Sequence, residues 1–130
     1  MAEDGPRRAA ALVERYLRAV AAQDWPTVEG CLAPTVVRRG PFGDDVEGRV
    51  GYLALLRRTM PALPGYRMDL DRVTEAGDAA GAAETGAIRV FAELRETVLV
   101  DGAPLETEEC LVFEVGGTIE VVSVYIRRTS

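Results

Sequence analysis

The sequence predicts an α+β fold in which three N-terminal helices pack on an antiparallel β-sheet. Apolar residues recur at helical spacing as far as Met60, and beyond the Pro64-Gly65 turn they alternate with polar residues at a period of two. Two-residue hairpin signals, Asp101-Gly102 and Gly116-Gly117, then separate the alternating segments. With 130 residues and no repeat or linker, the chain is expected to form one domain over residues 1–130.

The first half of the chain carries the helices. Pro6 favours the start of the first helix, which we expect to end near Gln23. Asp24 can cap a second, short helix that reaches Leu32, and a third helix is predicted over about 49–60. The first helix has an apolar stripe that would face the core, made of Leu12, Val13, Tyr16, Leu17 and Val20.

Five strands are predicted from alternation and turn signals. In chain order they are expected at 36–39, 66–71, about 82–100, 105–115 and 118–128. The strand at 36–39 is brief and precedes the third helix, and a turn at 76–78 leads into the long strand. The last three strands are joined by the two hairpin signals, so they should form an antiparallel meander.

Composition excludes several kinds of chemistry. The chain contains neither histidine nor lysine, which excludes Ser-His-Asp triads, histidine-ligated metals and Schiff-base lysines. Its net charge of −6, without a basic stretch, argues against nucleic acid as a partner. No signal peptide or apolar run of membrane-spanning length is found, so a cytoplasmic protein without a membrane partner is expected. Cys31 and Cys110 are predicted to be small buried hydrophobes rather than a disulfide.

Two glutamates interrupt the face of the sheet that alternation predicts to be buried. Glu96 is the single charge on that face of the long strand, and Glu109 is the single charge on that face of the next strand. A tight turn at Asp101-Gly102 places Glu96 opposite Thr107 and Leu94 opposite Glu109, so the two buried faces coincide. The two carboxyl groups then become diagonal neighbours, about 7–8 Å apart.

Acids on an apolar face are candidates for proton transfer. An unpaired carboxyl group there prefers to be neutral, and a neighbouring carboxyl group raises its pKa further. A protonated acid can donate a hydrogen bond to a developing oxyanion, and an ionised acid can accept a proton. The alternative is that one glutamate reaches water at the sheet rim or pairs with an arginine such as Arg38. Tyr16, whose hydroxyl needs a partner when buried, is either a further site residue or core.

Other residues could line a pocket beside these acids, although each of them alone is more typical of a core. A tight turn at Gly116-Gly117 would place Val124 opposite Glu109 and carry its alternate neighbours to the same face. The predicted lining consists of Trp25, Phe42, Tyr52, Leu56, Met60, Met68, Leu94, Val98, Thr107, Val122, Val124 and Ile126. Asp44 and Asp45, in a loop, are predicted to be solvated.

The order of elements and several local stretches form a recognisable pattern. The stretches are Arg15-Tyr16-Leu17, 32–43 with its Pro41-Phe42-Gly43, Gly48-Arg49, and 111–119 followed by Tyr125. Over about residues 9–128 the chain resembles the nuclear-transport-factor-2-like superfamily, which includes ketosteroid isomerases, SnoaL-like polyketide cyclases and limonene-epoxide-hydrolase-like enzymes. The resemblance implies a curved antiparallel sheet wrapped by three helices into a cone with an apolar cavity. It also implies a homodimer through the outer sheet face, where Val121 and Tyr125 would lie.

The resemblance implies roles for the site residues as well. Tyr16 stands where ketosteroid isomerases have their oxyanion tyrosine, and Glu109 stands where they have a protonated acid. Gly40 stands at the position of their base, so Glu96 would have to replace that base from another wall. The Asp-Arg-Asp set of the epoxide hydrolases falls on three apolar residues, Leu94, Ala92 and Val124. The SnoaL-like cyclases, which accept an acid at varied positions, are the class least contradicted.

Together these observations predict a small enzyme of specialised metabolism. It would be a cyclase or an isomerase that acts by acid/base chemistry on an apolar, carbonyl-containing substrate of polyketide or terpenoid type. Glu109 would be the principal acid/base group, Tyr16 a hydrogen-bond donor to the developing enolate and Glu96 a second acid. No cofactor or metal is expected, and the expected partners are a small apolar ligand and a second copy of the chain. The alternative is a non-catalytic cone that binds an apolar small molecule or a protein, or a dimeric scaffold.

Overall fold

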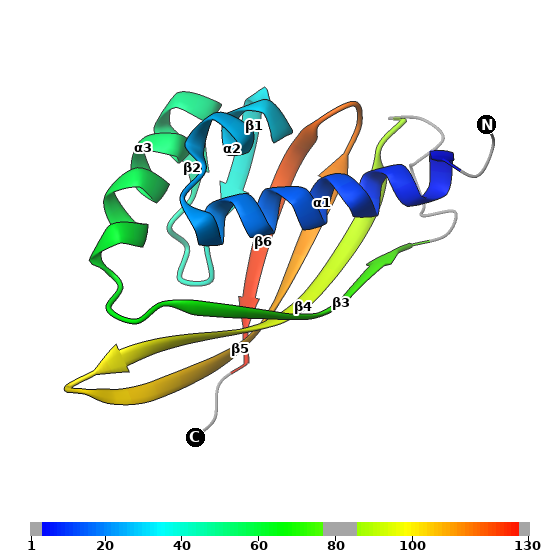
Figure 1. Ribbon diagram of the computed structural model, residues 1–130. Helices are drawn as coiled ribbons and strands as arrows, with labels where there is room; N and C mark the ends of the chain where they lie inside the picture. The colour runs from blue at the N-terminus through cyan, green and yellow to red at the C-terminus, as the bar shows by residue number, and fades with distance from the viewer. Residues whose placement is uncertain (1–3, 77–85, 128–130) are drawn as a thin grey trace.

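In the computed structural model, helices cover one face of a curved β-sheet (Figure 1). The structure describes residues 4–76 and 86–127, with side chains from residue 8 onward. Within these residues there are three α-helices, α1 (Asp4–Ala22), α2 (Trp25–Cys31) and α3 (Arg49–Thr59), and a 3₁₀ turn, Met60–Ala62, follows α3. The α+β class predicted from the change of periodicity is confirmed.

The strands of the described residues form one six-stranded sheet in the order β2-β1-β6-β5-β4-β3. They are β1 (Leu32–Arg39), β2 (Val46–Glu47), β3 (Arg67–Glu75), β4 (Ile88–Val100), β5 (Ala103–Val115) and β6 (Ile119–Ile126). Every pairing is antiparallel except that of β1 with β6, which is parallel. The expectation of a wholly antiparallel sheet is therefore wrong at this one pairing. β1 and β6 are distant in the chain, and a connection longer than a hairpin allows parallel pairing.

The predicted helix boundaries agree with the structure to within two residues. Asp24 caps α2 as expected, because its side chain accepts hydrogen bonds from the amide and the hydroxyl of Thr27. β1, by contrast, begins at Leu32, earlier than predicted. Pro34 is tolerated there because the pairing with β6 shifts register between Leu32 and Val37, where a residue without an N–H is acceptable. The two-residue β2 is too short for alternation to reveal.

Other predicted boundaries lie close to the edges of the described residues. Most of the predicted turn at 76–78 and the predicted start of the long strand near 82 fall outside the described residues. β3 begins one residue after its predicted start, and β6 ends at Ile126 rather than at 128.

The long hairpin formed by β4 and β5 has the predicted register. Leu94 pairs with Glu109, and Glu96 pairs with Thr107. The turn residues Asp101-Gly102 both have positive φ, 51° and 79°, as a type I′ turn requires. This turn fixes the register, and it brings the two glutamates to the same face of neighbouring strands.

The register between β5 and β6 differs from the predicted one by two residues. Glu109 lies opposite Ile126 rather than opposite Val124, which pairs with Leu111. The connection over 116–118 is longer than a two-residue turn, and a bulge interrupts the end of β5. Because side chains alternate with a period of two, this slip leaves the residues of β6 on their predicted face.

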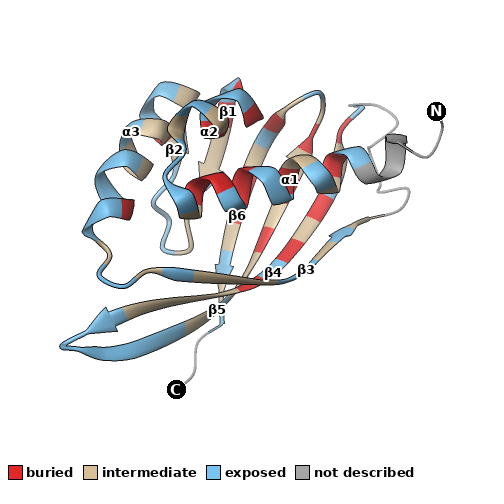
Figure 2. Cartoon of the chain, in the orientation of Figure 1, coloured by how far each residue is buried: buried red, intermediate tan, exposed pale blue. Residues whose placement is uncertain are grey.

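The hydrophobic core lies between α1 and the inner face of the sheet, where Figure 2 shows buried stretches on both. Its largest fully buried side chains include Phe113, Leu32, Ile119 and Val13. Beyond the core, the β4–β5 hairpin continues as an exposed arm (Figure 2). Cys31 and Cys110, both within the described residues, are free thiols. None of the described helices has the length and apolar character needed to cross a membrane.

Candidate active site

A cavity of about 410 Å³ opens between α1, α3 and the inner face of the sheet. Nine of the residues predicted for the site line it: Tyr16, Tyr52, Leu56, Met60, Met68, Leu94, Glu96, Glu109 and Val124. The lining is completed by Leu17, Val20, Arg38, Asp44, Leu55, Thr59, Leu63, Tyr66 and Leu111. The fold thus brings the three residues expected to be catalytic, from α1, β4 and β5, to one cavity.

The other predicted lining residues lie outside the cavity: Trp25, Phe42, Val98, Thr107, Val122 and Ile126. Phe42 is 71% exposed, because the loop between β1 and β2 carries it into solvent. Val98 and Thr107 stand on the β4–β5 arm, beyond the part of the sheet that the helices cover. Val122 is fully buried in the core, and Trp25 packs against the core from α2. Alternation indicates the face on which a residue lies, but it does not indicate depth along the cone.

Glu96 and Glu109 form a carboxyl pair on one wall of the cavity. Both are half-buried, and they hydrogen-bond to each other. The Tyr66 hydroxyl donates a second, short hydrogen bond to Oε2 of Glu96. Burial, followed by the hydrogen bond with Glu96 and the charge of Glu96, raises the pKa of Glu109 to about 9. Glu109 is therefore the protonated member of the pair at neutral pH, and the pair can both give and accept a proton.

Two tyrosine hydroxyl groups meet inside the same cavity. Tyr16 on α1 and Tyr52 on α3 are buried, and their hydroxyl groups hydrogen-bond to each other. The ring of Tyr16 packs edge to face on Phe113, with ring centroids 5.8 Å apart and an interplanar angle of 75°. Burial raises the pKa of both hydroxyl groups, so they act as neutral donors. The partner that a buried Tyr16 hydroxyl was expected to need is Tyr52.

The polar residues at the cavity mouth were not predicted for the site. Arg38 donates hydrogen bonds to the carbonyl oxygen and to Oδ2 of Asp44, each at 3.1 Å. The Asp44 side chain is 56% exposed, as its predicted solvation requires, but Asp44 also borders the cavity. A Cβ at Gly40 would lie 2.6 Å from the Asp44 carbonyl oxygen and would overlap its carboxylate. Arg38 lies two residues after the buried Val36, so the two side chains point to the same face of β1. This alternation is the sequence signal that could have identified Arg38 as a residue of the cavity.

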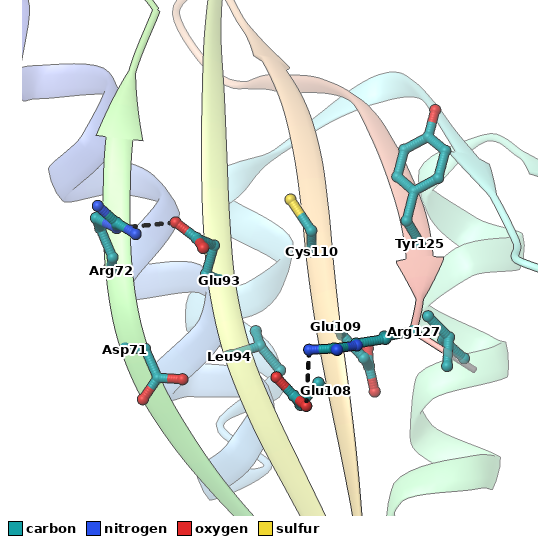
Figure 3. A pocket seen from close by; sticks show the side chains of 10 residues that line it. Asp71, Arg72, Glu93, Leu94, Glu108, Glu109, Cys110, Tyr125 and Arg127 are labelled. Atoms are coloured by element: carbon teal, nitrogen blue, oxygen red, sulfur yellow. Dashed lines mark ion pairs between the residues drawn. The ribbon is translucent and has the colours of Figure 1, made fainter. Parts of the chain in front are cut away.

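A wider depression, about 700 Å³, lies on the outer face of the sheet (Figure 3). Solvent-exposed ion pairs make up much of its wall, Arg72–Glu93 at 2.8 Å and Arg127–Glu108 at 3.5 Å. Such pairs contribute little binding energy, because water screens them. Burial raises the pKa of the Cys110 thiol in this depression, which disfavours a reactive thiolate. Ile126, which was predicted to line the inner cavity, borders this outer depression instead. The inner cavity, with its carboxyl pair, is therefore the candidate active site.

Comparison with known proteins agrees with this architecture. A family model described as the SnoaL-like domain matches residues 13–121. The sequence matched none of the curated proteins with which it was compared.

Solved structures provide further matches. An LEH-like epoxide hydrolase from M. tuberculosis is 23% identical, with a TM-score of 0.76 over 95% of this chain and 85% of that chain. A ketosteroid isomerase candidate from Kribbella flavida is 16% identical, with a TM-score of 0.76 over 96% of this chain and 82% of that chain. A polyketide cyclase candidate from Xanthomonas campestris is 21% identical, with a TM-score of 0.71 over 94% of this chain and 92% of that chain. At these identities the likeness shows the fold alone.

Proposed function

The chain belongs to the SnoaL-like domain family, and from this premise and the geometry of its cavity we propose that it is a small acid/base enzyme of specialised metabolism. It moves a proton beside a carbonyl group of an apolar small molecule of polyketide or terpenoid type, as a cyclase or an isomerase does. Glu109 is the principal acid/base group, Glu96 is the second acid/base group and Tyr16 donates a hydrogen bond to the developing enolate. The reaction needs no cofactor.

The observation that carries the proposal is the carboxyl pair in a largely apolar cavity. The pKa of Glu109 is raised to about 9, whereas Glu96 accepts a hydrogen bond from Tyr66. Two neighbouring carboxyl groups in different environments can take opposite roles, one as acid and one as base. Strongly perturbed acids in a cavity are typical of functional sites.

A proton can be taken up and returned within this pair. Glu96 accepts a proton from the carbon beside the carbonyl group, and the electron pair of the broken C–H bond passes into the enolate. Tyr16 donates a hydrogen bond to the enolate oxygen. Glu109 delivers its proton to a second carbon in an isomerisation, or to the oxygen of the carbonyl group that the enolate attacks in a cyclisation. The proton on Glu96 then returns to Glu109 through their hydrogen bond, which restores both groups.

Hydrogen–deuterium exchange tests this proposal without knowledge of the natural substrate. The wild-type chain should accelerate exchange beside the carbonyl group of an apolar cyclic ketone in heavy water. Glu109→Gln should lower that rate by about a hundredfold, the lower end of the range typical of general acid–base catalysis. Glu108→Gln is the matched control, because Glu108 is the exposed neighbour on the outer face of β5. Full exchange activity in Glu109→Gln would contradict the assignment.

Ligand binding without catalysis is a second candidate function, and one observation favours it. Glu96 already interacts with both Tyr66 and Glu109, so one of these contacts must loosen before Glu96 can accept a substrate proton. A planar phenol, which resembles an enolate, separates the two functions. Saturable phenol binding that depends on Glu109, together with no ketone exchange, would favour a binding protein over an enzyme.

We also propose that the chain forms a homodimer through its outer sheet face. Phe91, Val112 and Val121 lie half-buried on that face, beside Tyr125, which is 60% exposed. An apolar cluster of this kind on a sheet face is typical of a covered surface. Analytical ultracentrifugation should show a dimer that Tyr125→Arg weakens. A wild-type chain that is monomeric at every concentration tested would contradict this proposal.

A further inference from the structure

The hydroxyl of Tyr66 lies against one of the two carboxyl groups of the cavity, and we infer that Tyr66 is a positioning residue for Glu96. By holding Oε2 of Glu96, Tyr66 leaves Oε1 as the oxygen that accepts the proton of the substrate. It also favours the ionised form of Glu96, so that the two carboxyl groups keep different roles. The inference deepens the proposed function and rests on it, because it explains why Glu96 rather than Glu109 is the base.

The geometry of this hydrogen bond identifies the donor and the acceptor. The Tyr66 hydroxyl donates to Oε2 of Glu96 at 2.5 Å. Hydrogen bonds from a hydroxyl to a charged oxygen are short, about 2.5–2.7 Å between the oxygens. An ionised carboxylate only accepts hydrogen bonds, and its second oxygen has lone pairs of its own. The bond at Oε2 therefore matches an ionised Glu96, whose Oε1 can take the substrate proton while Tyr66 stays in place.

Tyr66 reaches Glu96 because of its place at the start of β3. Met68 pairs with Glu96 between β3 and β4, and Tyr66 stands two residues before Met68 on the same face. All three residues line the cavity. Tyr66 is therefore the diagonal neighbour of Glu96, a separation that an aromatic side chain can bridge.

The turn before β3 holds the backbone of Tyr66 in place. The Leu99 amide donates a hydrogen bond to the Pro64 carbonyl oxygen at 2.8 Å, which ties the turn to β4. Gly65 has a φ of 62°, and a Cβ there would lie 2.7 Å from Cγ of Leu99. Glycine suits both this positive φ and this close approach. The turn and the β4–β5 arm together fix the point from which the Tyr66 side chain reaches into the cavity.

The other polar groups of the cavity have partners of their own. Among the described lining residues, the charged and titratable groups beside Glu96 are Tyr16, Arg38, Asp44, Tyr52, Tyr66 and Glu109. The tyrosines of α1 and α3 hydrogen-bond to each other, and Arg38 pairs with Asp44 at 3.1 Å. Tyr66 is thus the tyrosine whose hydroxyl is directed at Glu96.

Tyr66 makes the carboxyl pair unequal. Glu96 and Glu109 are diagonal neighbours across β4 and β5, so they compete for one proton. A hydroxyl that donates to one of them stabilises the charge on that carboxylate, and the proton stays on the other. The pKa of Glu109, raised to about 9 by burial first of all, agrees with this division of roles.

The pH profile of hydrogen–deuterium exchange in the cyclic ketone tests the inference. Tyr66→Phe removes the donor and makes the ionised form of Glu96 less favourable, so exchange should be lost at a higher pH than in the wild type. The half-maximal point on the acid side should rise by about one unit, a tenfold effect, which is modest for a hydrogen bond to a charged group. Thr74→Val is the matched control, because it removes an exposed hydroxyl from the same strand, and its profile should match the wild type.

Two further variants separate positioning from a general effect on the fold. With 3-fluorotyrosine at position 66, the hydroxyl is more acidic and donates more strongly, so the acid side of the profile should move to lower pH. This variant keeps the ring and the hydroxyl, and it tests the inference even if Tyr66→Phe does not fold. In a Glu96→Gln background, Tyr66→Phe should cause little further loss of exchange, because Tyr66 acts through Glu96.

The inference and the proposed function fail in different ways. An acid side that does not move in Tyr66→Phe or with 3-fluorotyrosine, while Glu109→Gln still slows exchange, would overturn the role of Tyr66 and leave the proposed function intact. Losses from Tyr66→Phe and Glu96→Gln that simply add would also overturn that role, since independent effects need no contact between the two groups. A wild-type chain without ketone exchange, or exchange indifferent to Glu109→Gln, would contradict the proposed function and the inference together.

Discussion

Replacing Glu109 by glutamine should stabilise the fold above neutral pH while leaving it almost unchanged in acid. The folded protein holds the Glu109 proton up to a pKa of about 9, whereas the unfolded chain releases it near the ordinary value of 4.5. The stability that this proton provides is full below about pH 4.5 and is lost as the pH rises through 9. The full shift corresponds to about 6 kcal/mol at about 1.36 kcal/mol per pKa unit. Because Glu109 is half-buried and coupled to Glu96, we expect about half of this, roughly 3 kcal/mol.

Urea unfolding at about pH 5 and at about pH 8.5 measures this difference. Glutamine has nearly the shape of a protonated glutamate but cannot ionise, so Glu109→Gln should lose the decline of the free energy of unfolding at high pH. Glu108→Gln is the control, because Glu108 is exposed and pairs with Arg127 at the surface. If the wild type and Glu109→Gln lose stability in parallel as the pH rises, the raised pKa of Glu109 is wrong.

Three further substitutions test other parts of the structure. Tyr66→Phe removes the hydroxyl donor of Glu96 and should lower the free energy of unfolding by about 1–2 kcal/mol, measured with urea near neutral pH. Asp24→Ala removes the cap of α2 and should cost about 1 kcal/mol in the same assay, because the Thr27 amide loses its acceptor. Phe42→Ala should change stability by less than about 0.5 kcal/mol, since Phe42 is 71% exposed. The same variant should bind a phenol as the wild type does. A loss of phenol affinity would show that Phe42 contributes to the ligand site, as predicted from the sequence.

The sequence allowed the carboxyl pair to be predicted because two independent signals agreed. The alternation of each strand placed one glutamate on an apolar face, and the Asp101-Gly102 turn fixed the register that makes the two faces coincide. The same local rules identified the helices and the cap at Asp24. The resemblance to the nuclear-transport-factor-2-like superfamily is confirmed by the family match and the shared fold. It supplied the cone shape, which no local pattern contains.

The remaining features depend on contacts that a local pattern does not encode. The parallel pairing of β1 with β6 joins segments distant in the chain, and the slip between β5 and β6 follows from a bulge and a longer connection. The Asp44 carboxylate occupies the space that a side chain at residue 40 would fill, so its position depends on a glycine there. Phe42 was predicted to line the cavity because it is aromatic, but the geometry of its loop exposes it to solvent. Depth along the cone, rather than the choice of face, is what alternation leaves undetermined.

The central claim is that the cavity holds a carboxylic acid that stays protonated at neutral pH. Carbon-13 NMR of the glutamate side-chain carboxyl groups, titrated with pH and assigned with Glu109→Gln, measures this directly. The account predicts that the Glu109 resonance titrates near pH 9, well above its ordinary value of 4.5. A Glu109 resonance that titrates near its ordinary value of 4.5 would contradict the account, because Glu109 would then be ionised at neutral pH and could not serve as the acid for proton transfer.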